Sequence, residues 1–408
     1  MEPTPTHVNA PWTRVAGIIV LVLAATVAYT VASRSGSVRH NVSNRDSIAY
    51  WAAGKLLVRG ENPYNSVRVL EMERSQGYSE TKPLVLRTPP WSLFLVIPLG
   101  LTNAFAAWTA WIALSLVAIV VSVRLCWKMY GTDTRAPAIL LVVAYLFAPI
   151  PACLVAGQMG LALLLGIVLF LWAHRTHPFF AGMALILPFA KPHLLALFWV
   201  VLMLWGAKEK QWRLMAGVIV AFMMATGLAV IFDPGNFQHY RSMLHEASIG
   251  HEFIPAFSGV IRLVFFRRLF WMQFAPMAIG FFWACWFYWK RRVWWNWHEH
   301  GPALLVVSIL TAPYAWLTDE VVLIPAILQA AIWAYQRRRQ LAVKSKFAVS
   351  IFAALNLVLL LILNAKVPFA TGIYFWSSLV WFGWYFYALR IHSPRSGSIQ
   401  PASGTAEE

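Results

Sequence analysis

The stretch PFFAGMALILPFAKPHLLALFWVVLMLWG, residues 178–206, decides the fold class of this chain. Proline removes a backbone donor and pushes the preceding residue out of helical geometry, so the stretch predicts two apolar helices that meet at Lys191–Pro192. Irregular backbone at membrane depth is tolerated only inside protein or beside water. We therefore expect helices 178–190 and 193–206 of a membrane protein, with Lys191 facing an internal cavity near the outer surface. The alternative is a tight outside turn that places Lys191 among lipid headgroups.

The composition of the 408 residues extends this conclusion to the whole chain. Hydrophobic residues make up 60% and charged residues 12%, whereas soluble globular proteins are about 45–50% apolar and about 25% charged. The mean hydropathy is +0.62, and the 22 tryptophans suit the two edges of a bilayer, where Trp is enriched. These values exclude a soluble enzyme, a coiled coil, a collagen and a disordered protein. The three cysteines lie in apolar runs and form no disulfide framework or thiol–metal pattern.

Apolar runs divide the chain into about twelve candidate membrane-spanning helices, some of them shorter than the roughly 20 residues of an unassisted span. They are 15–32, 103–123, 137–154, 159–173, 178–190, 193–206, 212–232, 272–289, 302–317, 320–335, 347–364 and 372–389. The chain is thus expected to be an all-α polytopic membrane protein with a single membrane domain over residues 15–391, its first helix retained. A cytoplasmic N-terminus (1–14) precedes this domain, and a disordered cytoplasmic tail (392–408) follows it.

The net charge of 33 − 16 = +17 follows the positive-inside rule when the N-terminus is placed in the cytoplasm. Basic residues then crowd the inside loops, and the short outside turns hold only Lys191 and Lys366. Two long segments, 33–90 and 233–271, lie outside. We therefore expect both termini to be cytoplasmic and membrane lipid, not nucleic acid, to be the partner of the basic surface.

The first outer segment contains the stretch DSIAYWAAGKLLVRG, residues 46–60. Four apolar residues fall on one helical face, which is the pattern of a helix lying in the membrane interface: Ile48, Ala52, Leu56 and Leu57. A polar helix is expected over 66–76. Pro89–Pro90 is expected to end the regular structure that precedes the second span. The other outer segment ends in a short apolar piece at 258–266.

Few acidic residues remain outside, and Asp46 and Asp319 stand out because ionisable groups at membrane depth are expensive and usually functional. Asp46 opens the helix predicted at 46–60, and it is either an N-cap or a reactive carboxylate. Asp319 lies between two apolar runs, where the alternative is a carboxylate wetted at a helix boundary. Glu320 is expected to be a cap or a partner of Arg or Lys. Gln158, in the turn AGQMG, is either a plain turn residue or a hydrogen-bond partner of a substrate hydroxyl.

Four histidines share the outer side: His193, His239, His245 and His251. A lone histidine is more often structural than catalytic, and these lack a metal-ligand spacing such as HExxH. The chain also lacks a Walker A loop, a GxGxxG motif after a strand and a GxSxG elbow. The sequence therefore predicts no metal, no cofactor and no nucleotide chemistry on the cytoplasmic side.

Several short motifs follow one another along the chain. They are Asp46-x-x-x-Tyr50 with Gly60-x-x-Pro63-Tyr64, Pro89-Pro90, Gly157-Gln158, Ala181-Gly182 with Lys191-Pro192, and Pro313-Tyr314-Ala315-Trp316 with Asp319 and Pro325. Because these motifs occur in this order, the chain resembles glycosyltransferase family 87. That family includes the polyprenol-phosphate-mannose-dependent mannosyltransferases of the GT-C superfamily. The resemblance covers most of residues 46–325.

The resemblance implies a GT-C-like multi-pass enzyme of a bacterial inner membrane, with its active site opening on the outer, periplasmic face. Its donor would be a polyprenyl phosphate carrying one hexose such as mannose, and its acceptor a lipid or a glycan. Asp46, the acidic residue of the first outer loop, would act as the base. Some members have a histidine after the Pro-x-x-Trp motif, where this chain has Leu317-Thr318-Asp319-Glu320. Either Asp319 substitutes for that histidine, or a loop histidine approaches.

Elementary chemistry supports such a mechanism. A carboxylate that takes the proton of an attacking sugar hydroxyl contributes about 10²–10⁴-fold, and a cation beside the departing phosphate lowers the barrier further. Displacement with one base would invert the anomeric centre. Asp46 and Asp319 are the expected catalytic residues, converging in one water-filled hollow at the outer rim. Lys191 is the first candidate for binding the donor phosphate, followed by Arg45, Lys55, Arg59 and Arg262. The expected substrate-binding residues are Tyr50, Tyr64, Gln158, His193, His251, Trp316 and Glu320.

Two other functions are consistent with a membrane protein of this composition. A transporter or flippase of a lipid-linked sugar also uses broken helices and membrane-depth charges. Against it stand the absence of an internal repeat and the position of the polar groups at one edge. A non-catalytic assembly subunit would bury Asp319 and Lys191 at a cost without a purpose.

Overall fold

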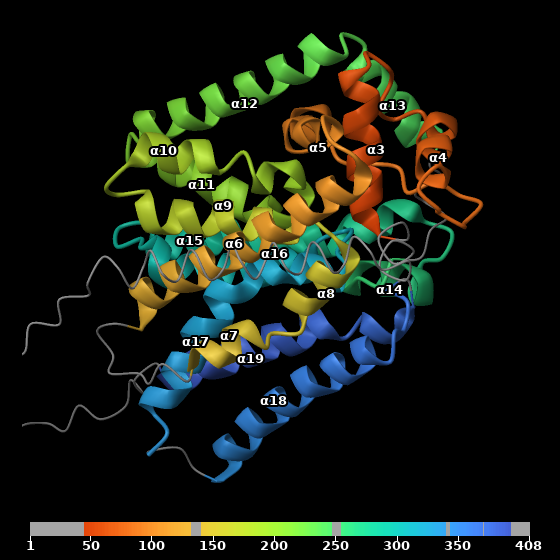
Figure 1. Cartoon of the computed structure of the whole chain (residues 1–408). Helices are drawn as coiled ribbons and strands as arrows, with labels where there is room; N and C mark the ends of the chain where they lie inside the picture. Colours follow the sequence, from red (N-terminus) through yellow and green to blue (C-terminus); the bar gives the residue numbers. More distant parts are fainter. Residues whose placement is uncertain (1–44, 132–139, 247–253, 340–342, 370, 393–408) are drawn as a thin grey trace, which may run out of the picture. The chain divides into compact units, whose positions relative to one another are not determined.

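The computed structural model describes residues 45–131, 140–246, 254–339, 343–369 and 371–392. Within these residues every regular element is a helix, which confirms the all-α fold class (Figure 1). The chain divides into two compact units. The first comprises Met1–Ile119, Leu154–Met159 and Ile219–His251, and the second comprises Val120–Cys153, Gly160–Val218 and Glu252–Glu408. Each unit is described by itself.

The described residues contain five helices that are long and apolar enough to cross a membrane, or six when a bent pair is counted as one span. The five are Ala104–Tyr130, Trp212–Phe232, Phe270–Arg291, Leu317–Gln336 and Ser345–Asn364. The expected number of about twelve is therefore not confirmed, and the first candidate, 15–32, lies outside the described residues. Shorter helices replace several of the others, because a continuous apolar run need not be a continuous helix.

Two expected spans differ clearly from the observed helices. The segment 137–154 is divided between α7 (Leu140–Tyr145) and α8 (Pro149–Ala156). The segment 302–317 contains the end of α16 (Trp297–Thr311), and the backbone turns extended at Ala312. Prolines account for both interruptions, since Pro149 begins α8 and Pro313 follows the end of α16.

The first unit is built around α3 (Asp46–Val58), the helix predicted at 46–60. Ten of its residues are buried, on every side of the helix, and only Asp46, Lys55 and Val58 are partly exposed. The expectation that only one face of this helix is buried is therefore wrong, and its location in the membrane interface stays a prediction. Gly54 makes the close packing possible, because a Cβ at this position would lie 2.1 Å from the carbonyl oxygen of Val96.

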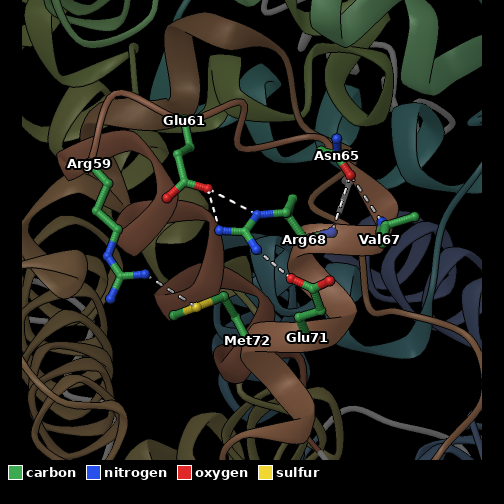
Figure 2. A network of polar contacts seen from close by, with 7 residues as sticks. All are labelled: Arg59, Glu61, Asn65, Val67, Arg68, Glu71 and Met72. Atoms are coloured by element: carbon green, nitrogen blue, oxygen red, sulfur yellow. Dashed lines mark hydrogen bonds and ion pairs between the residues drawn. The ribbon is translucent and has the colours of Figure 1, made fainter.

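Short helices of the outer segments complete the described part of the first unit. They are α4 (Ser66–Arg74), η1 (Pro90–Leu95), α5 (Ile97–Gly100) and α13 (Asn236–Glu246). The Asn65 side chain caps α4 by accepting from the amides of Val67 and Arg68, which confirms the polar helix predicted over 66–76. Figure 2 shows how Arg68 then joins α4 to the end of α3, with its guanidinium 2.8 Å from Glu61 and 2.5 Å from Glu71.

Two long helices contribute to both units: α6 (Ala104–Tyr130) and α12 (Trp212–Phe232). The remaining described helices belong wholly or mainly to the second unit. Besides α7, α8 and α16 they are α9 (Gly160–Ala173), α10 (Pro178–Ala184), η3 (Pro188–Ala190), η4 (Pro192–Leu195), α11 (Ala196–Lys208), α14 (Phe257–Phe265), η6 (Phe270–Phe274), α15 (Ala275–Arg291), η7 (Leu317–Leu323), α17 (Ile324–Gln336), α18 (Val343–Asn364), η8 (Gly372–Tyr374) and α19 (Ser377–His392).

The core of the second unit lies along α16, η7 and α17, whose residues are almost all buried. Gln329 joins this core across three helices, because its amide nitrogen donates to the carbonyl of His298 and its oxygen accepts from Tyr385. At the start of α9, a Cβ on Gly160 would lie 2.5 Å from the carbonyl oxygen of Thr318. The missing side chain lets α9 approach η7, which presents Asp319 and Glu320.

The stretch 178–206 is broken where the sequence predicted. The segments Pro178–Ala190 and Pro192–Lys208 meet at an angle of 116° at Lys191. Lys191 is the C-cap of η3 and the N-cap of η4, with φ −131° and ψ 69°, so it belongs to neither helix. The geometry is that of a broken span or a re-entrant loop, and it confirms the predicted interruption.

Candidate functional site

Asp46 is the first residue of α3, and its side chain is partly exposed. Arg45, not Asp46, occupies the N-cap position, with extended backbone at φ −121° and ψ 155°. A carboxylate in the first helical turn is stabilised by the positive end of the helix dipole. Asp46 therefore lies at a boundary between a buried helix and solvent.

Gln158 holds the Asp46 carboxylate from the segment Leu154–Met159 of the same unit. Its Nε2 donates a short hydrogen bond to Oδ2 of Asp46, and its Oε1 accepts from the Tyr50 hydroxyl at 3.0 Å. A carboxylate can only accept, so it takes the amide nitrogen, and the Tyr50 hydroxyl then donates to the amide oxygen. Asp46, Tyr50 and Gln158, each singled out by the sequence, thus form one hydrogen-bonded network.

Gly157 and Trp111, which lie next to this network, set its geometry. Gly157 has φ +71°, a conformation that favours glycine, and a Cβ there would lie 2.9 Å from the Cβ of Ser47. Trp111 donates from Nε1 to the Gly157 carbonyl at 2.9 Å and meets the Tyr50 ring edge-on at 5.1 Å. The Gly157–Gln158 motif therefore allows close approach to the start of α3 and directs the Gln158 side chain to Asp46.

A second carboxyl group near Asp46 was not singled out by the sequence. Glu73 on α4 is 0% exposed, and both of its carboxyl oxygens lie 3.2 Å from the amide nitrogen of Leu84. Burial raises the pKa of Glu73 to about 7; the Leu84 hydrogen bond opposes this shift and the negative charge of Asp46 adds to it. Glu73 lies among charged residues in a polar helix, so its burial had no signal in the sequence.

The other outer-loop residues occupy diverse positions. The Tyr64 hydroxyl is buried and donates to the Thr88 carbonyl at 3.0 Å, and its ring packs against Tyr240 at 5.4 Å, which favours a packing role. Arg59 is exposed at the end of α3 and contacts the Met72 sulfur at 3.8 Å, as Figure 2 shows. Burial lowers the pKa of the Arg45 guanidinium. Lys55 is partly exposed on α3.

In the second unit, Lys191 and Asp319 form an ion pair. Lys191 Nζ lies 2.6 Å from Asp319 Oδ1, and the side chains are 13% and 2% exposed. Oδ2 of Asp319 accepts from the backbone amide of Trp316 at 3.1 Å, and the Asp319 amide donates back to the Trp316 carbonyl. Asp319 is therefore a buried, paired cap of η7, and the interpretation as a merely wetted carboxylate is wrong.

Glu320 lies beside this pair in sequence but faces α19. Its carboxylate accepts from the Ser377 hydroxyl at 2.6 Å and from the Trp381 indole at 2.7 Å. Glu320 is 4% exposed, and its described partners are neutral. The expected Arg or Lys partner is therefore wrong, because a hydroxyl and an indole satisfy the carboxylate instead.

Further predicted site residues lie near the ends of the second unit's helices. The His193 ring meets Tyr314 edge-on at 6.1 Å, and Arg262 is buried on α14 with its guanidinium 5.6 Å from the centre of the Phe270 ring. Trp316 is the N-cap of η7. His251 lies outside the described residues, and His239 pairs with Asp233 at 2.8 Å.

The described ranges contain no group of three or more His, Cys, Asp or Glu side chains that could hold a metal ion. The prediction that the enzyme needs no metal stays a prediction. Each unit thus has one kind of polar group of its own: the first has a carboxylate held by an amide, and the second has a desolvated ammonium held by a carboxylate.

These features define the class: a helical integral membrane protein with a polar network at the start of one helix and a buried ion pair at the break of another. The chain belongs to glycosyltransferase family 87, whose model matches residues 88–363, more than half of the chain. The match confirms the resemblance and makes the protein a glycosyltransferase. No curated protein and no solved structure matches the chain. The matched range begins after Asp46 and Tyr50 and includes Gln158, Lys191 and Asp319.

Proposed function

We propose that this glycosyltransferase moves a hexose from a polyprenyl-phosphate donor to a lipid or glycan acceptor on the outer face of a bacterial inner membrane. The family supports sugar transfer, and the spans support a donor that stays in the bilayer. The observation on which the proposal chiefly depends is the Asp46 carboxylate, partly exposed and oriented by Gln158 and Tyr50. Mannose is the hexose that we would test first.

Asp46 is the proposed general base. The acceptor hydroxyl oxygen attacks C1 of the hexose, its proton passes to the Asp46 carboxylate, and the bond between C1 and the phosphate oxygen breaks. The electron pair of that bond leaves with the polyprenyl phosphate. One displacement by one nucleophile inverts the configuration at C1, so the product has the opposite anomeric configuration from the donor.

Gln158 and Tyr50 are positioning residues in this proposal. The amide of Gln158 restricts the Asp46 side chain through its hydrogen bond to Oδ2. The carboxylate would repel the amide oxygen, so the amide nitrogen faces Asp46, and the Tyr50 hydroxyl satisfies the amide oxygen on the other side. Preorganisation of this kind places a base within hydrogen-bond reach of its proton before the reaction begins.

Lys191 remains the first candidate for the donor phosphate, and Asp319 is then the group that holds the ammonium in a low-dielectric site. A phosphate that binds Lys191 would share the ammonium with Oδ1 of Asp319, at 2.6 Å. Charge-assisted hydrogen bonds to an ammonium stabilise the negative charge that develops on the leaving group. Asp319 is in this view a positioning residue and not a second base.

A transfer assay tests the proposed function. Purified protein in detergent is mixed with polyprenyl phosphate carrying a radiolabelled hexose and with a membrane-lipid extract as acceptor. We expect label in a new, acceptor-dependent product, and NMR of that product should show the inverted anomer. A mock purification from cells without the protein is the control. Absence of product with every hexose, together with donor movement in proteoliposomes, would favour the transporter instead.

A further inference from the structure

The second unit has an apolar groove that is not lined by Lys191 or Asp319. It has a volume of about 600 Å³ and lies among α7, α17, α18 and α19. These four helices are neighbours in Figure 1. Only 6% of the apolar segment of α18 is buried by protein, whereas the corresponding segment of Leu317–Gln336 is 100% buried. One wall of the groove is thus a membrane-spanning helix that the rest of the chain covers poorly.

A polar anchor keeps α18 in place while the groove beside it stays open. The Asn356 amide donates to the Leu146 carbonyl at 2.8 Å, and its oxygen accepts from the Ala148 amide at 2.9 Å. These bonds satisfy the backbone at the break between α7 and α8. Because its donor and acceptor are both engaged there, Asn356 marks a structural contact and not a ligand-binding group.

The charged residues of the groove gather at one end. Arg338 follows the C-terminus of α17, and Lys346 lies in the first turn of α18, so both belong to the same helix–helix connection. Both side chains are exposed. Arg338 lies over the Tyr335 ring, 3.6 Å from its centre, and donates to the Tyr335 carbonyl, which orients the guanidinium. The remainder of the lining is apolar or aromatic, apart from Asn356.

The length of the groove fits one leaflet of a bilayer. Along α17 it extends from Ile327 to Arg338, which is eleven steps along the chain and so about 16 Å at 1.5 Å per step. One leaflet of the hydrocarbon core is about 15 Å deep. A hydrocarbon chain that enters at the charged end would therefore be covered over the depth of that leaflet.

The position of the charges separates this groove from the proposed donor site. Asp319, which holds Lys191, precedes α17, whereas Arg338 follows it. The nineteen steps along the chain from Asp319 to Arg338 correspond to about 28 Å along a helix, close to the roughly 30 Å of the hydrocarbon core. A phosphate at Arg338 and a phosphate at Lys191 would thus lie at opposite edges of the membrane.

We propose that this groove binds an anionic diacyl phospholipid, with an acyl chain between α17 and α18 and the headgroup phosphate at Arg338 and Lys346. Basic residues between spanning helices bind anionic headgroups, and the charge at this end complements a phosphodiester. Phosphatidylcholine, whose headgroup has no net charge, binds less well because its choline adds a positive charge beside Arg338 and Lys346. The bound lipid fills the space that protein leaves open beside α18.

Native mass spectrometry of the full chain, with dioleoyl phosphatidylglycerol or dioleoyl phosphatidylcholine added in detergent, tests the proposal. We expect one tightly retained phosphatidylglycerol and a weaker phosphatidylcholine. The double variant Arg338→Ala/Lys346→Ala should lose about tenfold or more in phosphatidylglycerol affinity. Ala353→Trp, which fills the groove and leaves both charges in place, should reduce the retention of both lipids.

The control is Lys290→Ala/Arg292→Ala at the end of α15. Arg292 matches Arg338 closely, because it donates to the Trp289 carbonyl at 2.9 Å and lies 3.8 Å from the centre of that ring, but it does not line the groove. This control should retain phosphatidylglycerol like the wild type. Equal loss in the control, equal affinity for the two lipids, or displacement of phosphatidylglycerol by polyprenyl phosphate would each overturn the proposal.

Discussion

At the scale of single residues, carboxylates in this chain are held in three physically different ways. Asp46 accepts from a neutral amide, Asp319 pairs with an ammonium, and Glu320 accepts from a hydroxyl and an indole. A neutral donor orients a carboxylate without neutralising it, whereas an ammonium cancels its charge. Asp319 is therefore the carboxylate most dependent on a charged partner, and Asp46 is the one that we propose as the base.

The Lys191–Asp319 pair gives the first prediction. Lys191→Met leaves a buried carboxylate without its cation and should destabilise the protein by about 3–5 kcal/mol. The double variant Lys191→Met/Asp319→Leu removes both charges and should recover much of that loss. If Lys191 also binds the donor phosphate, the double variant stays inactive although it is folded. Thermal unfolding and the transfer assay on the same preparations separate stability from activity.

An active double variant would assign the pair a purely structural role. Failure of the second substitution to restore the unfolding temperature would show that coupling between the two charges does not explain the loss. Lys366→Met, at an exposed turn of the same unit, is the control for loss of a lysine.

Glu73 gives a prediction about pH. Its pKa rises from 4.5 to about 7 on folding, so folding favours the protonated form. The resulting stabilisation is fully present below pH 4.5 and is lost as the pH rises through about 7. The unfolding temperature should therefore fall between pH 5.5 and pH 8.5, and Glu73→Gln, which is always neutral, should reduce that fall. Differential scanning fluorimetry in detergent measures both.

The exposed neighbour Glu71 provides the comparison for Glu73. Glu71→Gln changes the charge of the same helix without removing a buried carboxyl group, so it should keep the pH dependence of the wild type. Identical pH profiles for the wild type and Glu73→Gln would contradict the account of Glu73.

The sequence identified individual residues better than it identified their partners. Asp46, Tyr50 and Gln158 were each predicted to contact substrate, and the structure joins them to one another. Lys191 and Asp319 were given separate roles, although they form a pair. Residue type and position along the chain indicate which groups are costly to bury. Partners more than a hundred residues apart depend on the three-dimensional packing, which no local pattern contains.

At the scale of elements, the first residues of α3 and α4 and the break at Lys191 agreed with the sequence. The Asn65 cap of α4 and the proline after Lys191 act locally, whereas α3 begins without a side-chain cap. The surroundings of α3 did not agree. Helical periodicity detects a polar face, but α3 has little polarity on any face apart from Lys55, so the four residues assigned to one apolar stripe were not distinctive. Gly54, in the middle of this helix, was the available signal of close backbone approach.

Gly54 gives a prediction at this scale. In Gly54→Ala the new Cβ would meet backbone atoms of Val96 at 2.1 Å and of Gly100 at 2.9 Å, which cannot move as a side chain would. We expect a destabilisation of at least about 1–3 kcal/mol, seen as a lower unfolding temperature or loss of the monodisperse protein peak. Gly227→Ala in α12 is the matched control, because its Cβ would meet nothing within 4 Å.

The control should be neutral or slightly stabilising, since alanine is favoured over glycine in a helix by about 0.5–1 kcal/mol. Equal unfolding temperatures for the two variants would show that α3 and α5 do not pack as closely as described.

At the scale of the whole molecule, composition alone identified a helical membrane protein, but the predicted number of spans is not confirmed by the described residues. Hydropathy adds up apolar residues and does not distinguish a helix that faces lipid from one enclosed by protein. The apolar segment of Leu317–Gln336 is fully buried, whereas protein buries only 6% of that of α18, although both have the apolar composition of a span. The distribution of positive charge remains the only basis for orientation, and it predicts a cytoplasmic connection between α17 and α18.

Cysteine labelling tests this orientation. In a background without Cys126, Cys153 and Cys285, single cysteines are placed at Arg339 and Lys366, which lie before and after α18. A membrane-impermeant maleimide should label Lys366→Cys in intact cells and Arg339→Cys only after permeabilisation. A third cysteine at the exposed Gln76 should behave like Lys366→Cys if α4 faces outside. The opposite pattern would reverse the topology and place Asp46 on the wrong side for an outward-facing reaction.

The rate of hexose transfer by Asp46→Asn tests the central claim most directly. The variant keeps the size and the hydrogen-bonding capacity of the side chain but removes the base, so we predict a loss of about 10²–10⁴-fold in kcat. The protein should remain folded and membrane-inserted, and Glu71→Gln should transfer at the wild-type rate. Wild-type transfer by Asp46→Asn would contradict the account, because Asp46 would then have no part in removing the acceptor proton.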